Sequence, residues 1–251
     1  MTEVACSSFL SQTAHPRDLA PFERDECFAL LSQHFKGVTR EQFRRDLAEK
    51  NVVLTLRDAS TGRLTGFSTM LAYETAVEGS PISVVCSGDT VVDPSAWNSP
   101  ALPREWIAAV NRLRVEFPNG PYYWLLITSG FRTYRLLSTF WQRFHPRHDR
   151  ADSTDSQQLL NSLARERFGE SYDPQAGIVR LRHPQILRPH LAGIPPQRLT
   201  DPHVAFFAQK NPGHVQGDEL ACLCSLDASN LTRAGRRMVF GVGAGSTNKP
   251  S

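Results

Sequence analysis

Apolar residues between positions 82 and 144 follow strand-like and helix-like patterns in turn. Residues 82–92 and 122–128 are short, almost continuous apolar runs, which indicates two buried strands. Residues 104–117 have apolar positions at helical spacing, and residues 131–144 form a second helix-like segment. Two buried strands joined by a helix predict parallel pairing, and α/β proteins bind ligands at the ends of such strands. We therefore expect a functional site in this unit.

The segment before this unit predicts two helices followed by a hairpin. Two stretches show helical spacing, and the second begins with Thr39 and Gln42, whose separation resembles a capping box. Two aliphatic, β-branched stretches follow, with the turn-forming DASTG between them. The helices are expected at residues 22–35 and 39–50, and the strands at residues 51–57 and 64–73.

The segment after the unit predicts shorter elements in a chain richer in proline. They are a helix at 159–168 that ends at Gly169, a strand at 177–182, a proline-rich connection at 183–202, and a last hairpin that pairs 203–209 with 219–226. Residues 1–20 are expected to form a flexible arm, and residues 241–251 a disordered tail. Residues 21–240 are expected to form one domain with an elaboration after residue 150.

Composition narrows the class of protein. The 251 residues are 40% hydrophobic and 21% charged, which is close to ordinary globular composition. A formal charge of +3, spread along the chain, argues against nucleic-acid or membrane partners. The five cysteines are odd in number, and three of them lie in apolar strand-like runs, as reduced thiols do. With no apolar stretch long enough to cross a membrane, we expect a soluble, cytoplasmic protein.

The order of the predicted elements, together with SGDTVVDP and the strand-then-helix YYWLLITSGFRTYRLLSTFWQRFHP, resembles the GCN5-related N-acetyltransferase (GNAT) superfamily. The resemblance covers roughly residues 22–146. It implies an α/β (α+β) fold with a mixed, mostly antiparallel sheet of about six or seven strands flanked by helices. In that superfamily two neighbouring strands splay apart and hold the pantetheine arm of acyl-CoA between them. Here these strands would be residues 82–92 and 122–128.

The resemblance also implies an activity. It is the transfer of an acyl group, typically acetyl, from acetyl-CoA or another acyl-CoA to an amine of a small molecule or a protein, by direct attack. The thioester carbonyl then needs hydrogen-bond donors for its oxyanion. Backbone N–H groups around Thr90 and Val91, with Val92 beside them, would provide these donors.

The same reaction needs a base for the amine and an acid for the leaving thiolate. Asp89 and Glu74 are the candidate bases, although either also fits a structural role as a strand-end or bulge residue. The superfamily often uses a tyrosine as the acid, and the matching position here is Trp141, which cannot protonate a thiolate. Tyr134 and Tyr123 are the possible substitutes, and both also fit an aromatic core.

The segment that should bind the CoA pyrophosphate departs from the superfamily pattern. Residues 93–106 contain no glycine and three prolines, and proline lacks the N–H that a phosphate cradle requires. Trp97, Asn98 and the side chain of Arg104 are the remaining candidates for binding the donor. Three interpretations stay open: an acyl-CoA enzyme with a modified site, an acyltransferase that uses an acyl-carrier-protein donor, and a non-catalytic GNAT-like module that binds an acyl group or another ligand.

No metal site is expected. Cys222 and Cys224 lie on one face of a predicted strand, but a lone C-x-C without a second pair is more typical of buried apolar filling. The basic run RFHPRHDR, which contains His145 and His148, is expected to be a solvated face rather than a surface for an acidic partner. The loop at residues 211–219 is interpreted mainly as a hairpin turn. The alternative is that it forms part of an acceptor site.

Overall fold

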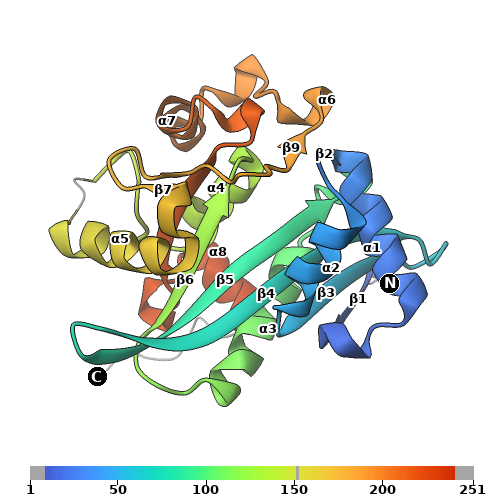
Figure 1. Cartoon of the computed structure of the whole chain (residues 1–251), viewed down its shortest axis with the longest axis horizontal. Helices are drawn as coiled ribbons and strands as arrows, with labels where there is room; N and C mark the ends of the chain where they lie inside the picture. The colour runs from blue at the N-terminus through green and yellow to red at the C-terminus, as the bar shows by residue number, and fades with distance from the viewer. Residues whose placement is uncertain (1–8, 151–152, 241–251) are drawn as a thin grey trace, which may run out of the picture. The chain divides into compact units, whose positions relative to one another are not determined.

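The structure is a computed structural model that describes residues 9–150 and 153–240. It contains an eight-stranded sheet with the order β1-β3-β4-β5-β6-β10-β8-β7 (Figure 1). Of the pairs whose register is recorded among the described residues, only β5 with β6 is parallel. The predicted mixed, mostly antiparallel α/β fold is therefore confirmed. The strands are β1 (Phe9–Ala14), β3 (Val52–Asp58), β4 (Leu64–Val77), β5 (Ser80–Val92), β6 (Tyr122–Thr128), β7 (Tyr172–Asp173), β8 (Ile178–Val179) and β10 (Glu219–Ser225).

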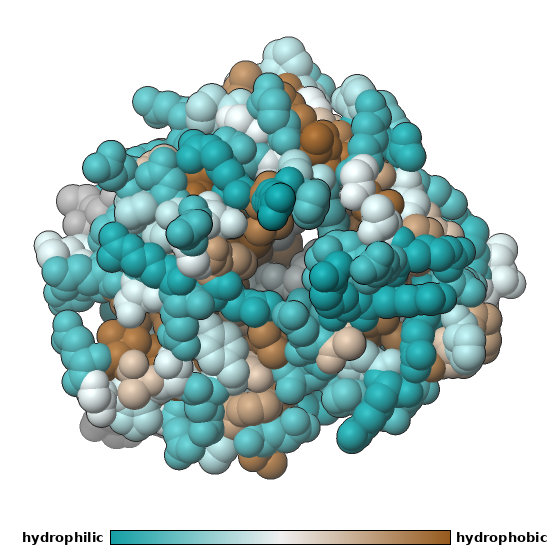
Figure 2. Space-filling view, in the orientation of Figure 1, coloured by the Kyte–Doolittle hydropathy of each residue, from teal (hydrophilic) through white to brown (hydrophobic). Residues whose placement is uncertain are grey.

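Two very short strands, β2 (Phe35–Lys36) and β9 (Ile186–Leu187), pair separately. The helices are α1 (Pro21–His34), α2 (Arg40–Ala48), α3 (Ala101–Glu116), α4 (Phe131–Phe140), α5 (Thr154–Phe168), α6 (Pro189–Ala192), α7 (Pro202–Lys210) and α8 (Arg233–Phe240). Within the described part of the chain, none of these helices is both long and apolar enough to cross a membrane. Figure 2 shows one face of the molecule, on which hydrophilic side chains predominate and apolar residues form only small separate areas.

The chain divides into two compact units, each made of discontinuous segments, where the sequence predicts one domain. The first unit comprises residues 1–34, 38–72 and 87–116. Its helices α1 and α2 lie on one face of its strands, and α3 packs on β1 and β3 (Figure 1). Its core includes Phe43 of α2, whose ring meets that of Phe67 on β4 edge-on at 6.4 Å. Aromatic pairs of this kind fix the helix on the sheet.

The second unit comprises residues 35–37, 73–86 and 117–251. Helix α5 packs on β6 and β10, and α4 packs on α7 and α8. Tyr134 of α4 is fully buried in the centre of this packing, and its ring lies 5.5 Å from that of Phe207 on α7. The four described cysteines, Cys27, Cys86, Cys222 and Cys224, are buried and form no disulfide.

The predicted last hairpin is wrong, because residues 203–209 are helical. They belong to α7, which begins with Pro202 after Asp201, and the Asp201 carboxylate accepts a hydrogen bond from the backbone N–H of His203 at 3.0 Å. An Asp N-cap followed by proline is a strong helix start. The partner strand exists as β10, but it pairs with β6 and β8 instead.

Smaller differences concern the ends of elements. Residues 9–14 lie within the predicted flexible arm, but they form β1. Each of them pairs antiparallel with a residue of β3, from Phe9 with Asp58 to Ala14 with Val53. Helix α4 ends at Phe140, earlier than predicted, because Trp141 is extended and bridges to Leu231. The Thr39 cap is confirmed, since its hydroxyl accepts from the N–H of Gln42 at 3.2 Å. The predicted tail at 241–251 lies outside the described residues.

Candidate functional site

The end of strand β5 carries most of the predicted site. The parallel register of β5 with β6 runs from Ser83↔Tyr122 to Cys86↔Leu125. Strand β5 continues beyond the last of these recorded pairs to Val92. Its final residues, 87–92, belong to the first unit, so the site is described within that unit.

The direction of the backbone groups at this end follows from two contacts. The N–H of Asp93 donates to the carbonyl oxygen of Thr65, the second residue of β4, at 2.7 Å, so Asp93 faces β4. Along a strand successive residues face opposite neighbours, with the N–H and C=O of one residue on the same side. Val91 therefore also faces β4, whereas Thr90 and Val92 face away from it.

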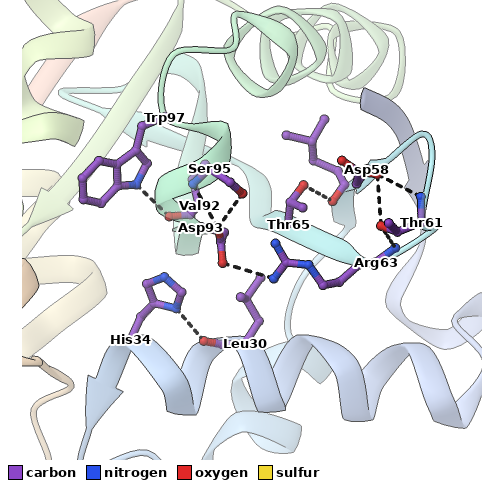
Figure 3. Close-up of polar contacts among 11 residues, drawn as sticks. Leu30, His34, Asp58, Thr61, Arg63, Thr65, Val92, Asp93, Ser95 and Trp97 are labelled. Atoms are coloured by element: carbon purple, nitrogen blue, oxygen red, sulfur yellow. Dashed lines mark hydrogen bonds and ion pairs between the residues drawn. The ribbon is translucent and has the colours of Figure 1, made fainter. Parts of the chain in front are cut away.

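An indole confirms this direction for Val92. The Nε1–H of Trp97 donates to the carbonyl oxygen of Val92 at 2.8 Å (Figure 3), and Trp97 is not on a strand. The carbonyl oxygen of Val91 points the other way, since a Cβ placed on Gly66 of β4 would lie 3.1 Å from it. The N–H groups of Thr90 and Val92 are thus the donors that face away from β4, whereas the N–H of Val91 faces it.

Side chains on both faces of this strand end are held in place. The hydroxyl of Thr90 contacts that of Ser68 on β4 at 2.8 Å, and Val91 is buried. Asp89 is half-buried, and its negative charge interacts electrostatically with the thiol of Cys27 on α1. Burial, followed by nearby acidic groups that include Asp89, raises the pKa of the Cys27 thiol to about 12. This cysteine is therefore protonated at neutral pH and is no nucleophile.

The loop after β5 is ordered by Asp93. Its carboxylate accepts from the N–H and the hydroxyl of Ser95, at 3.0 and 2.5 Å, and pairs with Arg63 at 3.3 Å (Figure 3). Burial alone would raise the pKa of Asp93, but the bonds from Ser95 and the charge of Arg63 outweigh it and lower this pKa. The aspartate is therefore ionised over the whole physiological range.

The start of α3 has few free backbone donors. The N–H of Ala101 is bonded to the hydroxyl of Ser99 at 3.2 Å, and Pro103 has no N–H. Asn98 and Arg104 are exposed, and no side-chain partner of Arg104 is recorded among the described residues. The Arg104 guanidinium therefore stays a predicted contact for an anion at this loop, beside Trp97 and Asn98.

His34 is a candidate that sequence reasoning missed. It is the last residue of α1 and is only 7% exposed. Its Nδ1 lies 2.9 Å from the carbonyl oxygen of Leu30, which can only accept, so Nδ1 carries the proton and Nε2 is the basic nitrogen. Figure 3 shows the ring turned from α1 toward the segment that carries Val92 and Trp97.

The remaining predicted residues belong to the second unit and have structural contacts. Glu74 accepts hydrogen bonds from the backbone and side chain of Asn119, at 3.3 and 2.9 Å. Tyr134 is fully buried, and its hydroxyl donates to the carbonyl oxygen of Pro146 at 2.9 Å. Tyr123 lies on β6, in register with neighbours on β5 and β10. The structure thus brings Asp89, Thr90, Val91, Val92 and Trp97 together in one unit.

No protein-family model matches this sequence, and no curated protein does. Solved structures do show partial similarity. One is a GNAT-family N-acetyltransferase from Escherichia coli in complex with CoA, at 16% identity over 54% of this chain and 69% of that chain, with a TM-score of 0.38. Another is an Enterococcus faecalis protein described as a probable N-acyltransferase, at 15% identity and a TM-score of 0.41.

A third is N-myristoyltransferase from Saccharomyces cerevisiae with bound myristoyl-CoA, at 13% identity over 70% of this chain and 43% of that chain, with a TM-score of 0.37. The match to the Enterococcus faecalis protein covers 54% of this chain but only 33% of that chain, so this chain spans about a third of its length. Each of these likenesses covers part of the chain at low sequence identity. No residue role is taken from them.

Proposed function

We propose that this chain transfers an acyl group from a thioester to an amine. The observation that carries the proposal is the direction of the last backbone groups of β5. The N–H groups of Thr90 and Val92 face away from β4, on the side where Trp97 contacts Val92. N–H groups of alternate residues on one strand edge lie two residue rises, roughly 6.5 Å, apart. One of them can therefore donate to the thioester oxygen, as an oxyanion site requires, and the other to a carbonyl further along an extended donor.

The reaction follows from this geometry. The thioester carbonyl oxygen accepts a hydrogen bond from one of the two N–H groups, and the amine nitrogen attacks the carbonyl carbon to form a C–N bond. The negative charge on oxygen collapses, the C–S bond breaks, and the thiolate takes up the proton that the amine loses. Because the strand fixes both donors, they need no reorganisation as charge develops, and one such donor typically contributes about 100- to 1,000-fold to the rate.

We assign the base to His34 and the positioning of the amine to Asp89. The Leu30 carbonyl holds the proton on Nδ1 of His34, which leaves Nε2 able to accept the proton of the amine. Asp89 is half-buried on the neighbouring strand end, where a carboxylate favours a cationic or hydrogen-bonding amine. Both residues belong to the first unit, together with the two donors.

The donor is an acyl-CoA held chiefly by side chains. The loop at residues 93–106 cannot cradle a pyrophosphate with backbone N–H groups, since it lacks glycine and contains three prolines. The exposed Arg104 guanidinium and the half-exposed Trp97 ring are the groups able to contact phosphate and adenine. Binding by an exposed arginine predicts that affinity for CoA falls as salt is added.

Release of free thiol tests the proposal directly. Acetyl-CoA and myristoyl-CoA serve as donors, and an aminoglycoside and an amino-sugar phosphate as acceptors, because similar solved structures carry such names. A peptide amine is added to represent a protein acceptor. We expect thiol release that depends on an amine. His34→Gln removes the base, so the rate should fall about 100-fold or more while donor binding stays unchanged.

His190→Gln is the matched control, since His190 is an exposed histidine of the second unit. It should leave the rate unchanged. Equal rates for His34→Gln and His190→Gln would contradict the role of His34. Donor binding without thiol release for any acceptor would favour the non-catalytic binding module instead.

A further inference from the structure

We infer that the second unit contains a site for a divalent transition metal, formed by His148, Asp149 and His203. The first two residues lie in the segment between α4 and α5, and the third is the second residue of α7. One potential ligand atom from each lies within 4.8 Å of the others. This inference does not depend on the proposed acyl transfer, whose groups lie in the first unit.

The two imidazoles are already in contact. Their ring centroids are 4.4 Å apart, and the rings meet edge to face at 72°. In a bound site neighbouring ligand atoms would be about 3 Å apart, given metal–nitrogen bonds of about 2.0–2.1 Å. Closing from 4.8 Å needs only a side-chain adjustment, and His148 is exposed and able to make it.

His203 has a buried nitrogen without a hydrogen bond. Its Nδ1 has almost no contact with solvent and no hydrogen-bond partner in the structure. A buried polar atom of this kind is costly unless it finds a ligand, and imidazole nitrogen is among the commonest metal ligands in proteins. The ring of His203 also packs against that of Phe144, at 5.7 Å between centroids, which restricts its orientation.

The backbone that presents the ligands is firmly held. His145 exchanges two hydrogen bonds with Leu223 of β10, at 2.8 and 2.7 Å, and the next carbonyl, that of Pro146, accepts from buried Tyr134. On α7 the backbone of His203 is fixed by the Asp201 cap. Ligands on fixed backbones lose little entropy when they bind a metal.

Asp149 is oriented by a neighbouring arginine. Both of its oxygens accept from the guanidinium of Arg147, with a 2.6 Å bond from Nη2 to Oδ2, and Arg147 also lies over the ring of Phe144. Each carboxylate oxygen has a second lone pair, so this contact leaves Asp149 able to bind a metal. The arginine then acts as an outer partner that fixes the carboxylate, at some cost in affinity from its positive charge.

The chemistry of the three ligands selects the ion. Two imidazoles and one carboxylate suit Zn²⁺, Co²⁺ and Ni²⁺, whereas Mg²⁺ and Ca²⁺ prefer sites made of oxygen. Bound there, the ion would join the segment after α4 to the start of α7. The sequence predicts no such site, because His203 is remote from His148 along the chain.

Calorimetric titration of the full chain with ZnCl₂ tests the inference, using protein without a histidine tag and freed of metal with a chelator. Absorption spectra with CoCl₂ report the ligand set independently. We expect one Zn²⁺ per chain with micromolar affinity and a thermal midpoint that rises with Zn²⁺ concentration. His148→Gln should weaken binding by about 100-fold or more, since even outer-shell partners contribute roughly 10- to 100-fold.

His148 is exposed, so its replacement should not affect folding, and His190→Gln is again the matched control. Asp149→Asn should weaken Zn²⁺ binding by about tenfold or more. Failure of the wild-type chain to bind Zn²⁺ at millimolar concentration would overturn the inference. So would binding that His148→Gln leaves intact, because the ion would then lie elsewhere.

Discussion

At the scale of single residues, Tyr134 illustrates how a hydroxyl that resembles a catalytic acid can serve the core. Its hydroxyl is fully buried and donates to the Pro146 carbonyl at 2.9 Å. We predict that Tyr134→Phe lowers the free energy of unfolding by about 1–2 kcal/mol, because the carbonyl loses its partner in a buried place. Urea denaturation measures this loss, and the rate of thiol release by the folded variant should not change.

Tyr123→Phe is the matched control. Tyr123 is half-buried, and no hydrogen bond of its hydroxyl is recorded among the described residues, so its replacement should change the free energy of unfolding by less than about 0.5 kcal/mol. A large loss of thiol release in Tyr134→Phe, with stability unchanged, would instead assign the acid to Tyr134.

The sequence identifies a candidate site residue when the residues next to it along the chain form a recognisable pattern. Asp89, Thr90 and Val92 are found because they end an apolar strand that is followed by a turn. His34 is not found, because one histidine on an apolar helix face reads as a core residue. Only the fold shows that its ring turns toward the end of β5.

At the scale of elements, the parallel register of β5 with β6 depends on the tight approach before β6. Gly120 has φ +70°, and a Cβ there would lie 1.9 Å from the carbonyl oxygen of Pro81. We predict that Gly120→Ala lowers the free energy of unfolding by about 3 kcal/mol or more, since it adds a clash with backbone to the cost of a left-handed conformation. Chemical denaturation measures the difference from the wild-type protein.

Gly177 provides the control for this substitution. It has φ +71°, but a Cβ there would meet nothing within 4 Å. Gly177→Ala should therefore cost only the left-handed conformation, about 1–2 kcal/mol. Equal losses for the two variants would show that the approach of Gly120 to Pro81 does not limit stability.

Elements are predictable where one pattern dominates. Strand β6 has the bounds that its apolar run predicts, 122–128. The strand predicted at residues 203–209 (HVAFFAQ) is wrong for a local reason. The two adjacent phenylalanines favour a strand by propensity, but Asp201 and Pro202 start a helix. Strand β1 is missed because none of its six residues is buried, and its position depends on backbone pairing with β3 rather than on apolar burial.

At the scale of the whole molecule, the two proposals occupy different units and can fail separately. The first unit contains the end of β5, His34 and Arg104, and the second contains the histidine pair and Asp149. Strands β4 and β5 contribute residues to both units. The overall order of elements is predictable from sequence, but the metal ligands are not, because the fold alone brings α7 to the segment after α4.

The central claim is that the N–H groups of Thr90 and Val92 donate to carbonyl groups of the bound thioester donor, one of them to the thioester carbonyl itself. Amide hydrogen exchange measured by NMR, with and without acetyl-CoA and in the absence of an amine, tests it most directly. We predict that exchange at Thr90 and Val92 slows by about tenfold or more when the donor binds. Asp93, whose N–H is already bonded to Thr65, should not change. Unchanged exchange at Thr90 and Val92 with the donor bound would contradict the account.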